Sequence, residues 1–481
     1  MKLKKLLKNI KYKEIKGQKD IEISTITADS RVASFNGLFI ARKGKTFDGS
    51  KFIYQAVDAG VKAVITDIYD PFLKNITQII VDDPAAIEAD IAANFYNHSA
   101  KKLFKVAITG TNGKTTTSYL LKHILDLNKG ETALIGTIEY ILGKNKIQSN
   151  LTSPDSVNIQ KYLNEIKENN LKNVCMEVSS HAIDQNRLKH INFDIAIFTN
   201  LTQDHLDYHK TFENYKNAKK KLFDTLDKTA FSIVNIDDEN TQYLIKDTKS
   251  KIFSYSTKMK AGLQAFDIKY SLKGTSFTVK YKDETFDFFT NLIGRYNVSN
   301  ILAAISLGII LKIDLNKLSS DLKSFKQVKG RLEKISNNKN FHVFVDFAHS
   351  PDAMKNVLLT LKDLKKSRII NVFGCGGNRD QLKRSQMATI SETHADITIV
   401  TNDNPRNEDP NEIITDIVKG FSKNANYIIE TNRKQAIEKA IKLAKVDDII
   451  IITGKGHETC QIFENITIEF DDSKIAKQIL S

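Results

Sequence analysis

The sequence is poor in cysteine, and the cysteines that it has are far apart. Among 481 residues there are only 3, Cys175, Cys375 and Cys460. An odd number of cysteines at such distances excludes a disulfide framework, and no spacing between them is typical of a zinc site. The composition therefore predicts a protein of a reducing cytosol.

Long apolar segments are missing as well. The longest, residues 301–311, is too short to span a bilayer, which needs about 20 consecutive apolar residues. Residues 1–9 are basic, but no apolar segment follows them, so they do not have the pattern of a signal peptide. We expect a cytoplasmic protein that does not associate with membranes.

Clustered positive charge is also absent, although the chain is basic overall. The 71 Lys and Arg outnumber the 57 Asp and Glu, which gives a formal net charge of +14. Such a charge fits nucleic acid, a membrane surface or polyanionic small substrates. However, the lysines are spread along the chain among acids, with no arginine-rich arm and no basic stripe interleaved with aromatic residues. This pattern favours a solvated lysine-rich surface and no nucleic-acid partner.

What the sequence does contain is a regular alternation of strand-like and helix-like segments. Such alternation predicts α/β domains with mainly parallel sheets, and 481 residues correspond to about three domains. We place a small N-terminal α/β domain at residues 1–103, a central phosphate-loop domain with a parallel sheet at 104–329, and a C-terminal Rossmann-like domain at 330–481. Strands are expected at 105–108, 173–178, 193–198, 231–235, 342–346, 369–373, 396–400 and 449–452, and helices at 85–97, 118–125 and 297–311.

Residues 108–117, Ile-Thr-Gly-Thr-Asn-Gly-Lys-Thr-Thr-Thr, lie between a predicted strand and a predicted helix. In this context backbone N–H groups and the helix N-terminus point at an anion. Lys114 would reach the terminal phosphates of a nucleoside triphosphate, and the Thr115 hydroxyl would bind magnesium. The spacing departs from the Walker pattern, because the first glycine is Gly110 instead of residue 108. The alternative is a glycine-rich turn with a solvated lysine.

Polar residues that follow the predicted strands are the next candidates, because ligands of α/β sheets gather at the carboxyl ends of strands. Glu177 ends one strand, where a carboxylate facing the phosphate loop suits magnesium; a solvated acid is the alternative. Asp204, His205, Asp207 and His209 follow the next strand, and form either a metal or acid–base loop or plain surface. Three consecutive lysines, residues 219–221, are typical of a solvated helix face.

These segments and several others occur in an order that resembles the Mur ligases. The resemblance is carried by residues 110–116, 176–182, 199–201, 204–209, 218–223, 292–297, 330–331, 345–352, 372–377, 403–406 and 454–458. The motifs are collinear over nearly the whole chain.

The resemblance implies an ATP-dependent ligase that forms an amide bond in peptidoglycan precursor synthesis. ATP would phosphorylate the terminal carboxylate of UDP-N-acetylmuramoyl-L-alanyl-D-glutamate, and an amine would attack the acyl-phosphate. Lys114, Glu177, His205 and Lys219 are implied as catalytic residues. Two magnesium ions are implied on Thr115, Glu177, His205 and Lys219, with Lys219 carboxylated, since a carbamate is a metal ligand whereas an ammonium repels cations. A monomer is expected.

The resemblance also implies the binding residues. For ATP these are Gly110, Thr111, Asn112, Gly113, Lys114, Thr115, Thr116, Asn297, Asn300, Arg331, Asp346 and His349. For the UDP substrate, which the first domain would help to bind, they are Ser30, Thr152, Ser153, Ser179, Gln185 and Arg187. Segments 29–31 and 43–49 resemble the family's uridine-side motifs. For the incoming amino acid they are Arg379, Asp403, Asn404, Pro405, Arg406, Gly454 and Glu458.

Arg406 favours meso-diaminopimelate as the incoming amino acid. The distal carboxylate of diaminopimelate suits a bidentate guanidinium, whereas the ammonium of lysine would be repelled by it; Glu458 would pair with the distal ammonium. The lysine-adding version of the same family is the alternative, and Arg406 argues against it. A folate-type glutamate ligase or regulatory homologue conflicts with the motif at 29–31 and with the first domain. A nucleic-acid-binding ATPase conflicts with the missing Asp-Glu box.

A few residues depart from the family pattern. Serines stand for a threonine at Ser153 and for a proline at Ser385, and Lys329 also stands for a proline. Phe347 and Cys460 stand for tyrosines, and Asn378 stands for an aspartate. None of these changes removes a predicted metal ligand or the arginine at 406.

Overall fold

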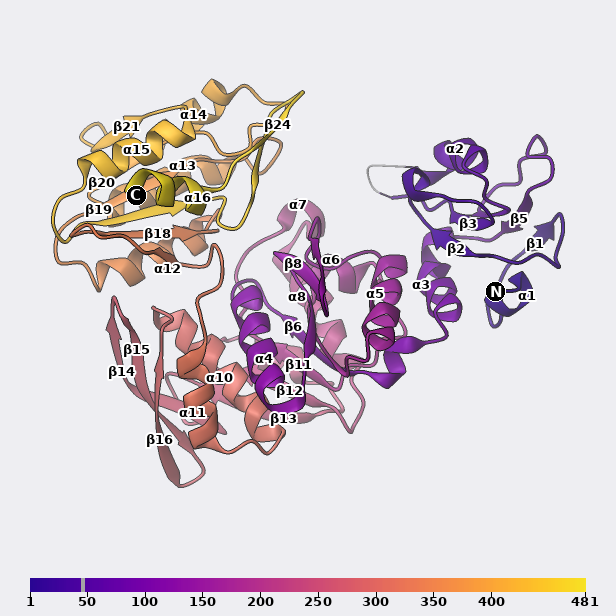
Figure 1. Ribbon diagram of the computed structural model, residues 1–481, viewed down its shortest axis with the longest axis horizontal. Helices are drawn as coiled ribbons and strands as arrows, with labels where there is room; N and C mark the ends of the chain where they lie inside the picture. The colour runs from indigo at the N-terminus through magenta and orange to yellow at the C-terminus, as the bar shows by residue number, and fades with distance from the viewer. Residues whose placement is uncertain (45–47) are drawn as a thin grey trace.

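The computed structural model describes residues 1–44 and 48–481, and its strands form three large sheets in succession along the chain (Figure 1). In Figure 1 the N-terminal and C-terminal sheets lie at opposite ends of the molecule, with the central sheet between them. Lys45, Thr46 and Phe47 of the segment 43–49 lie outside the described residues.

The N-terminal sheet has five strands in the order β1-β5-β4-β3-β2. They are β1 (Glu14–Lys16), β2 (Thr25–Thr27), β3 (Gly37–Ile40), β4 (Ala63–Thr66) and β5 (Thr77–Ile80); the helices are α1 (Leu3–Leu6), η1 (Ser30–Val32), η2 (Gly49–Phe52), α2 (Ile53–Asp58), α3 (Pro84–Phe95) and η3 (Ser99–Lys102). Only β1 is antiparallel to its neighbour. The Asp83 carboxylate accepts from the Ala85 N–H and so caps α3, which ends two residues before the predicted helix.

The central sheet has 11 strands in the order β16-β15-β14-β13-β12-β11-β6-β10-β7-β8-β9. They are β6 (Phe104–Thr109), β7 (Thr132–Ile135), β8 (Glu139–Leu142), β9 (Asn145–Gln148), β10 (Asn173–Glu177), β11 (Ile195–Phe198), β12 (Phe231–Asn235), β13 (Lys251–Ser256), β14 (Leu263–Ser271), β15 (Gly274–Tyr281) and β16 (Glu284–Thr290). Its seven inner strands, from β14 to β7 in the order just given, are parallel, as predicted. At the two edges, β15–β16 and β8–β9 add antiparallel hairpins.

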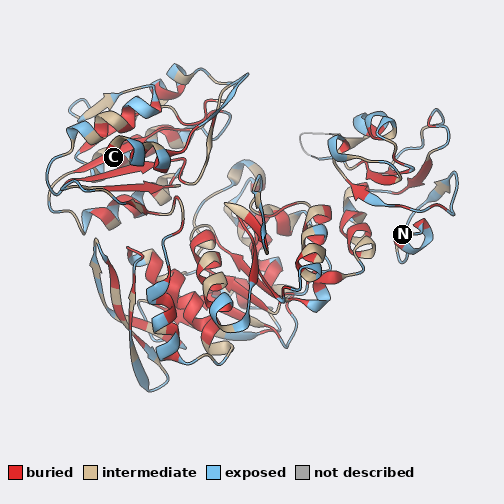
Figure 2. Ribbon diagram, viewed as in Figure 1, coloured by how far each residue is buried: buried red, intermediate tan, exposed pale blue. Residues whose placement is uncertain are grey.

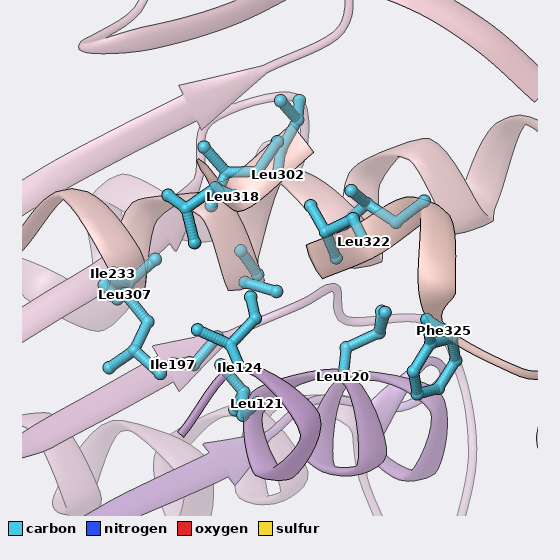
Figure 3. Packing of buried hydrophobic residues seen from close by; sticks show 14 of the residues in the cluster. Leu120, Leu121, Ile124, Ile197, Ile233, Leu302, Leu307, Leu318, Leu322 and Phe325 are labelled. Atoms are coloured by element: carbon cyan, nitrogen blue, oxygen red, sulfur yellow. The ribbon is translucent and has the colours of Figure 1, made fainter. Parts of the chain in front are cut away.

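Helices cover the parallel part of this sheet. They are α4 (Lys114–Lys129), α5 (Ser156–Glu168), α6 (Ser180–Asp184), α7 (Leu206–His209), α8 (Phe212–Asp224), α9 (Thr241–Ile245), α10 (Arg295–Ile310) and α11 (Leu315–Ser324). Figure 3 shows Leu120 and Ile124 of α4 facing the apolar side chains of α10 and α11, including Leu302 and Leu318. Each such side chain stabilises the fold by about 1.5–3 kcal/mol when it is fully buried. This core fixes α4, and with it the phosphate loop, against α10.

The C-terminal sheet has six strands in the order β17-β18-β22-β19-β20-β21, and only β17 is antiparallel. The strands are β17 (Glu333–Ile335), β18 (His342–Asp346), β19 (Ile369–Phe373), β20 (Ile397–Val400), β21 (Tyr427–Ile429) and β22 (Ile449–Thr453). A separate hairpin follows, formed by β23 (Cys460–Ile462) and β24 (Thr467–Glu469). The helices are α12 (Pro351–Lys362), α13 (Leu382–His394), α14 (Pro410–Val418), α15 (Arg433–Leu443) and α16 (Asp472–Leu480). The central strands are buried throughout, as Figure 2 shows, because helices cover both faces.

Two expectations about the chain as a whole can be compared with these elements. Cys175 and Cys375 are buried, Cys460 is half-buried, and all three are free thiols. Within residues 1–44 and 48–481, no helix combines the length and the apolar character that a membrane crossing needs.

Candidate active site

The phosphate loop has the predicted context of strand, loop and helix. β6 ends at Thr109 and α4 begins at Lys114. Gly113 has a φ of +86°, and a Cβ at this position would lie 2.4 Å from Asn300 Oδ1. A larger residue would meet both backbone strain and this contact, so the loop requires a glycine here. Residue 108 is a buried strand residue, which explains the irregular Walker spacing.

Lys114 lies over the loop that it follows. Its Nζ donates to the carbonyl oxygens of Gly110 and Thr111, at 2.9 Å each. Burial lowers the pKa of this lysine, and the nearby Arg331 lowers it further, while Glu177 raises it. The ammonium is therefore held inside the loop, where a phosphate would bind, and the alternative of a solvated lysine is wrong.

The Glu177 carboxylate lies at the carboxyl end of β10 and is fully buried (0% exposed). It accepts hydrogen bonds from Thr115 Oγ1 at 3.1 Å and from Thr137 Oγ1 at 2.8 Å, as well as from the Thr137 N–H. The alternative of a solvated strand-end acid is therefore wrong. Carboxylate and hydroxyl oxygens in such proximity are the donors that magnesium prefers.

Lys219 lies on α8 and is 1% exposed. Its Nζ donates to the Gly110 carbonyl at 3.0 Å and lies 4.8 Å from the centre of the Tyr215 ring. Burial, and next the charge of Lys114, hold the pKa of Lys219 well below its ordinary value. This shift increases the fraction of neutral amine, the form that reacts as a nucleophile.

The two lysines beside Lys219 differ from each other. Lys221 is exposed, as predicted, but Lys220 is buried and pairs with Asp224 and Asp247 at 2.6 Å each. The prediction of a solvated face is therefore wrong for Lys220. It failed because Asp247, which follows α9, lies beside α8 only in the folded chain.

The loop that follows β11 brings His205 towards this lysine. His205 has a φ of +54°, its side chain is 44% exposed, and its ring lies 6.0 Å from that of Tyr215, which Lys219 also contacts. His209 is buried, with its Nε2 2.9 Å from Ser180 Oγ. Among the described parts of the chain, no three His, Cys, Asp or Glu side chains are arranged to hold a metal. The predicted magnesium ligands include two residues of these types, Glu177 and His205. The other two are Thr115 and Lys219.

Two buried asparagines of α10 support the loop from the other side. Asn300 Nδ2 donates to Asn297 Oδ1 at 3.0 Å, and Thr117 Oγ1 donates to Asn300 Oδ1 at 3.3 Å. A cavity of ≈ 280 Å³ lies next to Asn297 and Arg331. Its remaining walls come from Leu272, Lys273, Asn291, Leu292, Ile293, Gln327, Leu332, Lys334 and Ser336. Of the residues predicted to bind ATP, Asn297 and Arg331 thus line a hollow at the junction of the central and C-terminal domains.

The C-terminal domain reaches this junction through the residues just before β17 and those at the end of β18. Arg331 Nη2 donates to Thr115 Oγ1 at 3.1 Å, and its guanidinium lies 4.6 Å from the centre of the Phe347 ring. The Asp346 carboxylate accepts from the N–H groups of Leu332 and Ala348, and burial raises its pKa. The ring of Phe347 thus lies against the Arg331 guanidinium.

Five of the six predicted substrate residues gather around the end of β10. The Ser153 hydroxyl donates to the Glu177 carbonyl at 2.8 Å, and Arg187 Nη1 donates to the Ser153 carbonyl at 2.9 Å. Around them, Thr152 contacts Thr137, Ser179 caps α6, and Gln185 accepts from Arg187. Ser30 lies apart from these five, in the N-terminal domain, where its hydroxyl donates to Gln55.

The sequence reasoning missed a buried acid between the N-terminal and central domains. Glu88 of α3 is 2% exposed and pairs with Arg42 at 3.1 Å. Burial raises its pKa to about 7, against the opposing effect of Arg42, and Arg187 is among the nearby charges. A signal was present, because Glu88 falls on the same helical stripe as the buried Pro84 and Ile91.

The predicted amino-acid pocket lies at the carboxyl ends of β19, β20 and β22. Arg406 has a φ of +54°, and its Nη1 donates to the Gly377 carbonyl at 2.8 Å. Burial lowers the pKa of Arg406, and the second cause is the positive charge of the nearby Arg379. Both arginine side chains lie beside Gly376, where a Cβ would be 2.9 Å from Arg406 Nη1 and 4.0 Å from Arg379 Cγ. Asp403 and Pro405 are buried in the same loop, and a Cβ at Gly454 would lie 2.7 Å from Asp403 Oδ2.

Asn404 and Glu458 complete this group of residues, and Arg406 Nη1 lies 3.5 Å from the Asn404 carbonyl oxygen. Asn404 Nδ2 donates to Glu458 Oε2 at 2.8 Å. Lys455, which was not predicted, pairs with the same carboxylate oxygen at 2.7 Å. The structure therefore brings the predicted amino-acid residues together and adds a lysine behind them.

Three segments of the chain match Mur ligase families. Residues 22–102 match the family described as Mur ligase family, catalytic domain; residues 108–308 match Mur ligase middle domain; and residues 330–456 match Mur ligase, glutamate ligase domain. These segments contain the three large sheets almost completely.

Individual proteins show the same similarity. The chain is 44% identical to a protein of Chlamydia abortus named UDP-N-acetylmuramoyl-L-alanyl-D-glutamate--2,6-diaminopimelate ligase, over 100% of this chain and 99% of that protein. It is 41% identical, over the same shares, to a protein of that name from Caldanaerobacter subterraneus. A solved structure of that name has a TM-score of 0.68 and 29% identity, over 100% of this chain and 98% of the other. The chain belongs to the Mur ligase family.

Proposed function

We propose that the protein is the ATP-dependent ligase that adds meso-diaminopimelate to UDP-N-acetylmuramoyl-L-alanyl-D-glutamate, a step of peptidoglycan precursor synthesis. The observation that carries the proposal is that two guanidiniums, Arg379 and Arg406, and the carboxylate of Glu458 gather in the loops that follow β19, β20 and β22. A distal amino-acid head, with one carboxylate and one ammonium, matches these charges. The names of relatives at 41–44% identity support the same substrate.

The reaction has two transfers. The terminal carboxylate of the dipeptide attacks the γ-phosphorus of ATP, and ADP leaves. The amine of diaminopimelate then attacks the acyl carbon, loses a proton and expels phosphate. Both steps depend mainly on positioning and on neutralisation of phosphate charge. Lys114 and the N–H groups of the loop 110–113 would hold the β- and γ-phosphates, and Arg331 would approach from the C-terminal domain.

Magnesium fits the residues near the loop. Thr115 Oγ1 and the Glu177 carboxylate, 3.1 Å apart, are oxygen donors of the kind that magnesium takes, and bound magnesium neutralises phosphate charge. A second ion would be held by His205 and a carboxylated Lys219. The burial of Lys219, which lowers the pKa of its amine, supports this modification, because carbon dioxide reacts with the neutral form only.

The UDP substrate would extend from the N-terminal domain to the end of β10. Ser30 would contact the uridine, and Thr152, Ser153, Ser179, Gln185 and Arg187 would contact the peptidyl part. Domain limits at 1–103, 104–329 and 330–481 belong to the same proposal. The N-terminal, central and C-terminal sheets lie within these limits.

Phosphate release tests the proposal. The purified protein is incubated with ATP, magnesium and UDP-N-acetylmuramoyl-L-alanyl-D-glutamate, and either diaminopimelate or lysine is added. We expect release with diaminopimelate and little with lysine. Release with lysine alone would establish the lysine-adding alternative, and release with neither amine would refute the ligase function.

A further inference from the structure

Lys455 lies in the loop that follows β22, and its side chain is fully buried (0% exposed). Its Nζ donates to Asn404 Oδ1 at 2.9 Å and to Glu458 Oε2 at 2.7 Å. A buried ammonium is retained only where it is paired and hydrogen-bonded. Both of its partners are residues that the proposed function places against the incoming amino acid.

Lys455 fixes the orientation of the Asn404 side chain. Asn404 Oδ1 accepts from Lys455 and from the Ile462 N–H at 3.1 Å, and Nδ2 donates to Glu458 Oε2. An ammonium donates and never accepts, so the amide oxygen must face Lys455 and the amide nitrogen must face Glu458. Lys455 therefore holds this orientation together with the Ile462 N–H and the Glu458 carboxylate.

Lys455 also fixes the Glu458 carboxylate. Oε2 receives two donors, one from Lys455 and one from Asn404, so Oε1 is the oxygen that a ligand can use. The Glu458 side chain is 32% exposed, whereas Lys455 behind it is fully buried. The lysine therefore touches only the protein, whereas the carboxylate that it pairs with is partly exposed.

We propose that Lys455 is a positioning residue that gives the pocket its selectivity for a second amino group on the incoming amino acid. The inference rests on the proposed function, because it takes Glu458 to be the partner of that amino group. Lys455 acts through Asn404 and Glu458, while the distal carboxylate is bound independently on the side of Arg406. Loss of the lysine should therefore weaken recognition of the ammonium and leave recognition of the carboxylate in place.

Two acceptors separate these contributions. Diaminopimelate carries a distal ammonium and a distal carboxylate, and 2-aminopimelate carries the distal carboxylate alone. The ratio of their kcat/KM values, followed by phosphate release, measures recognition of the ammonium. We expect the wild-type protein to prefer diaminopimelate by about 10- to 100-fold, the range for one charge-assisted hydrogen bond. In Lys455→Met the ratio should fall at least about fivefold through a higher KM for diaminopimelate, with the KM for ATP nearly unchanged.

Controls distinguish this role from a merely structural one. Lys439→Met removes another lysine of the same domain, one that pairs with Glu430 at 3.0 Å, and should leave the ratio unchanged. Glu458→Gln should lower the ratio as Lys455→Met does, and the double variant should lower it no further.

Several outcomes would overturn the inference. Equal losses with both acceptors in Lys455→Met would show that the lysine only supports the fold. A wild-type ratio in Glu458→Gln would overturn the inference even if Lys455→Met did not fold. A wild-type protein that is inactive with diaminopimelate would contradict the proposed function instead.

Discussion

Lys219 shows how burial changes the chemistry of a single side chain. It is 1% exposed, next to the phosphate loop, and its pKa is held well below the ordinary value, chiefly by burial. If its carbamate is a metal ligand, Lys219→Ala should lower kcat by about 100-fold, equivalent to about 2.7 kcal/mol of barrier. Formate or acetate should restore part of the rate of phosphate release. Lys221→Ala, on the exposed face of α8, is the matched control, and full activity in Lys219→Ala would exclude the role.

The raised pKa of Glu88 should make the stability of the fold depend on pH. Its pKa rises from an ordinary 4.5 to about 7, chiefly by burial, so the folded protein binds its proton more tightly than the unfolded chain does. The stability that this proton supplies is complete below pH 4.5 and is lost as pH rises through 7. Relative to the wild type, Glu88→Gln should therefore gain roughly 3 kcal/mol between pH 4.5 and pH 8. Melting temperatures at pH 5 and pH 8 measure this gain, and an equal difference at both would contradict it.

Single residues also show what sequence reasoning could and could not supply. Glu177, Lys219 and Arg406 were identified because their motifs are local and ordered along the chain. Lys455 and Glu88 were missed, because their roles depend on partners that only the fold brings near, such as Asn404, 51 residues from Lys455. Burial of a charge and the identity of its counter-ion are tertiary properties, and no local pattern of residues specifies them.

Helices and strands could be predicted where the pattern of apolar residues along the sequence is strong. The central strands of the C-terminal sheet are almost continuously apolar, and the predicted 449–452 corresponds to β22, Ile449–Thr453. In contrast, β15 and β16 were not predicted. Their burial alternates along the strand and includes exposed Lys280 and Glu284, so their pattern is weaker than that of a buried strand. The antiparallel edges were missed for this reason, whereas the parallel centre, which holds the phosphate loop, was found.

Helix α4 offers a matched test of the phosphate loop, because glycines stand at both of its ends. Both glycines have positive φ, +86° with ψ −12° at Gly113 and +92° with ψ 170° at Gly130, so alanine would strain the backbone at either position by about 1–3 kcal/mol. A Cβ at Gly113 would also lie 2.4 Å from Asn300 Oδ1, whereas one at Gly130 would have no atom within 4 Å. Gly113→Ala should raise the Kd for ATP at least about tenfold, because the loop and α10 must separate. Gly130→Ala should leave this Kd within about twofold, as measured by calorimetry. A similar rise of the Kd in both variants would show that the cause is a less stable helix α4 and not the contact with Asn300.

At the scale of the whole molecule, the site is assembled from residues of different domains. The phosphate loop belongs to the central domain, and Arg331 and the amino-acid pocket belong to the C-terminal domain. The N-terminal domain is joined to the central one by polar contacts, of which Lys189 and His190 with Asp90 are examples. Catalysis therefore depends on how the domains are held together, as well as on the groups that they carry.

A substitution of Asp352, in α12, should show how far catalysis depends on the docking of the C-terminal domain. Its Oδ2 accepts from Asn112 Nδ2 of the phosphate loop at 3.0 Å and from Thr202 Oγ1 at 3.3 Å, so one carboxylate joins the C-terminal domain to two loops of the central domain. Each such bond to a charged group contributes about 1.5–3 kcal/mol. Asp352→Ala should weaken this docking, lower kcat about 5- to 30-fold and increase the radius of gyration in small-angle scattering.

The same substitution should leave the KM for the UDP substrate unchanged, because Asp352 bonds to Asn112 and Thr202 and to none of the six residues proposed to bind that substrate. Asp363→Ala removes an exposed acid at the other end of α12 and serves as the control. A reduced kcat with an unchanged radius of gyration would mean that Asp352 orients the phosphate loop locally. A larger radius with an unchanged kcat would mean that domain docking in this form does not limit turnover. Only the two changes together support a carboxylate that couples the position of the C-terminal domain to the loop that binds ATP.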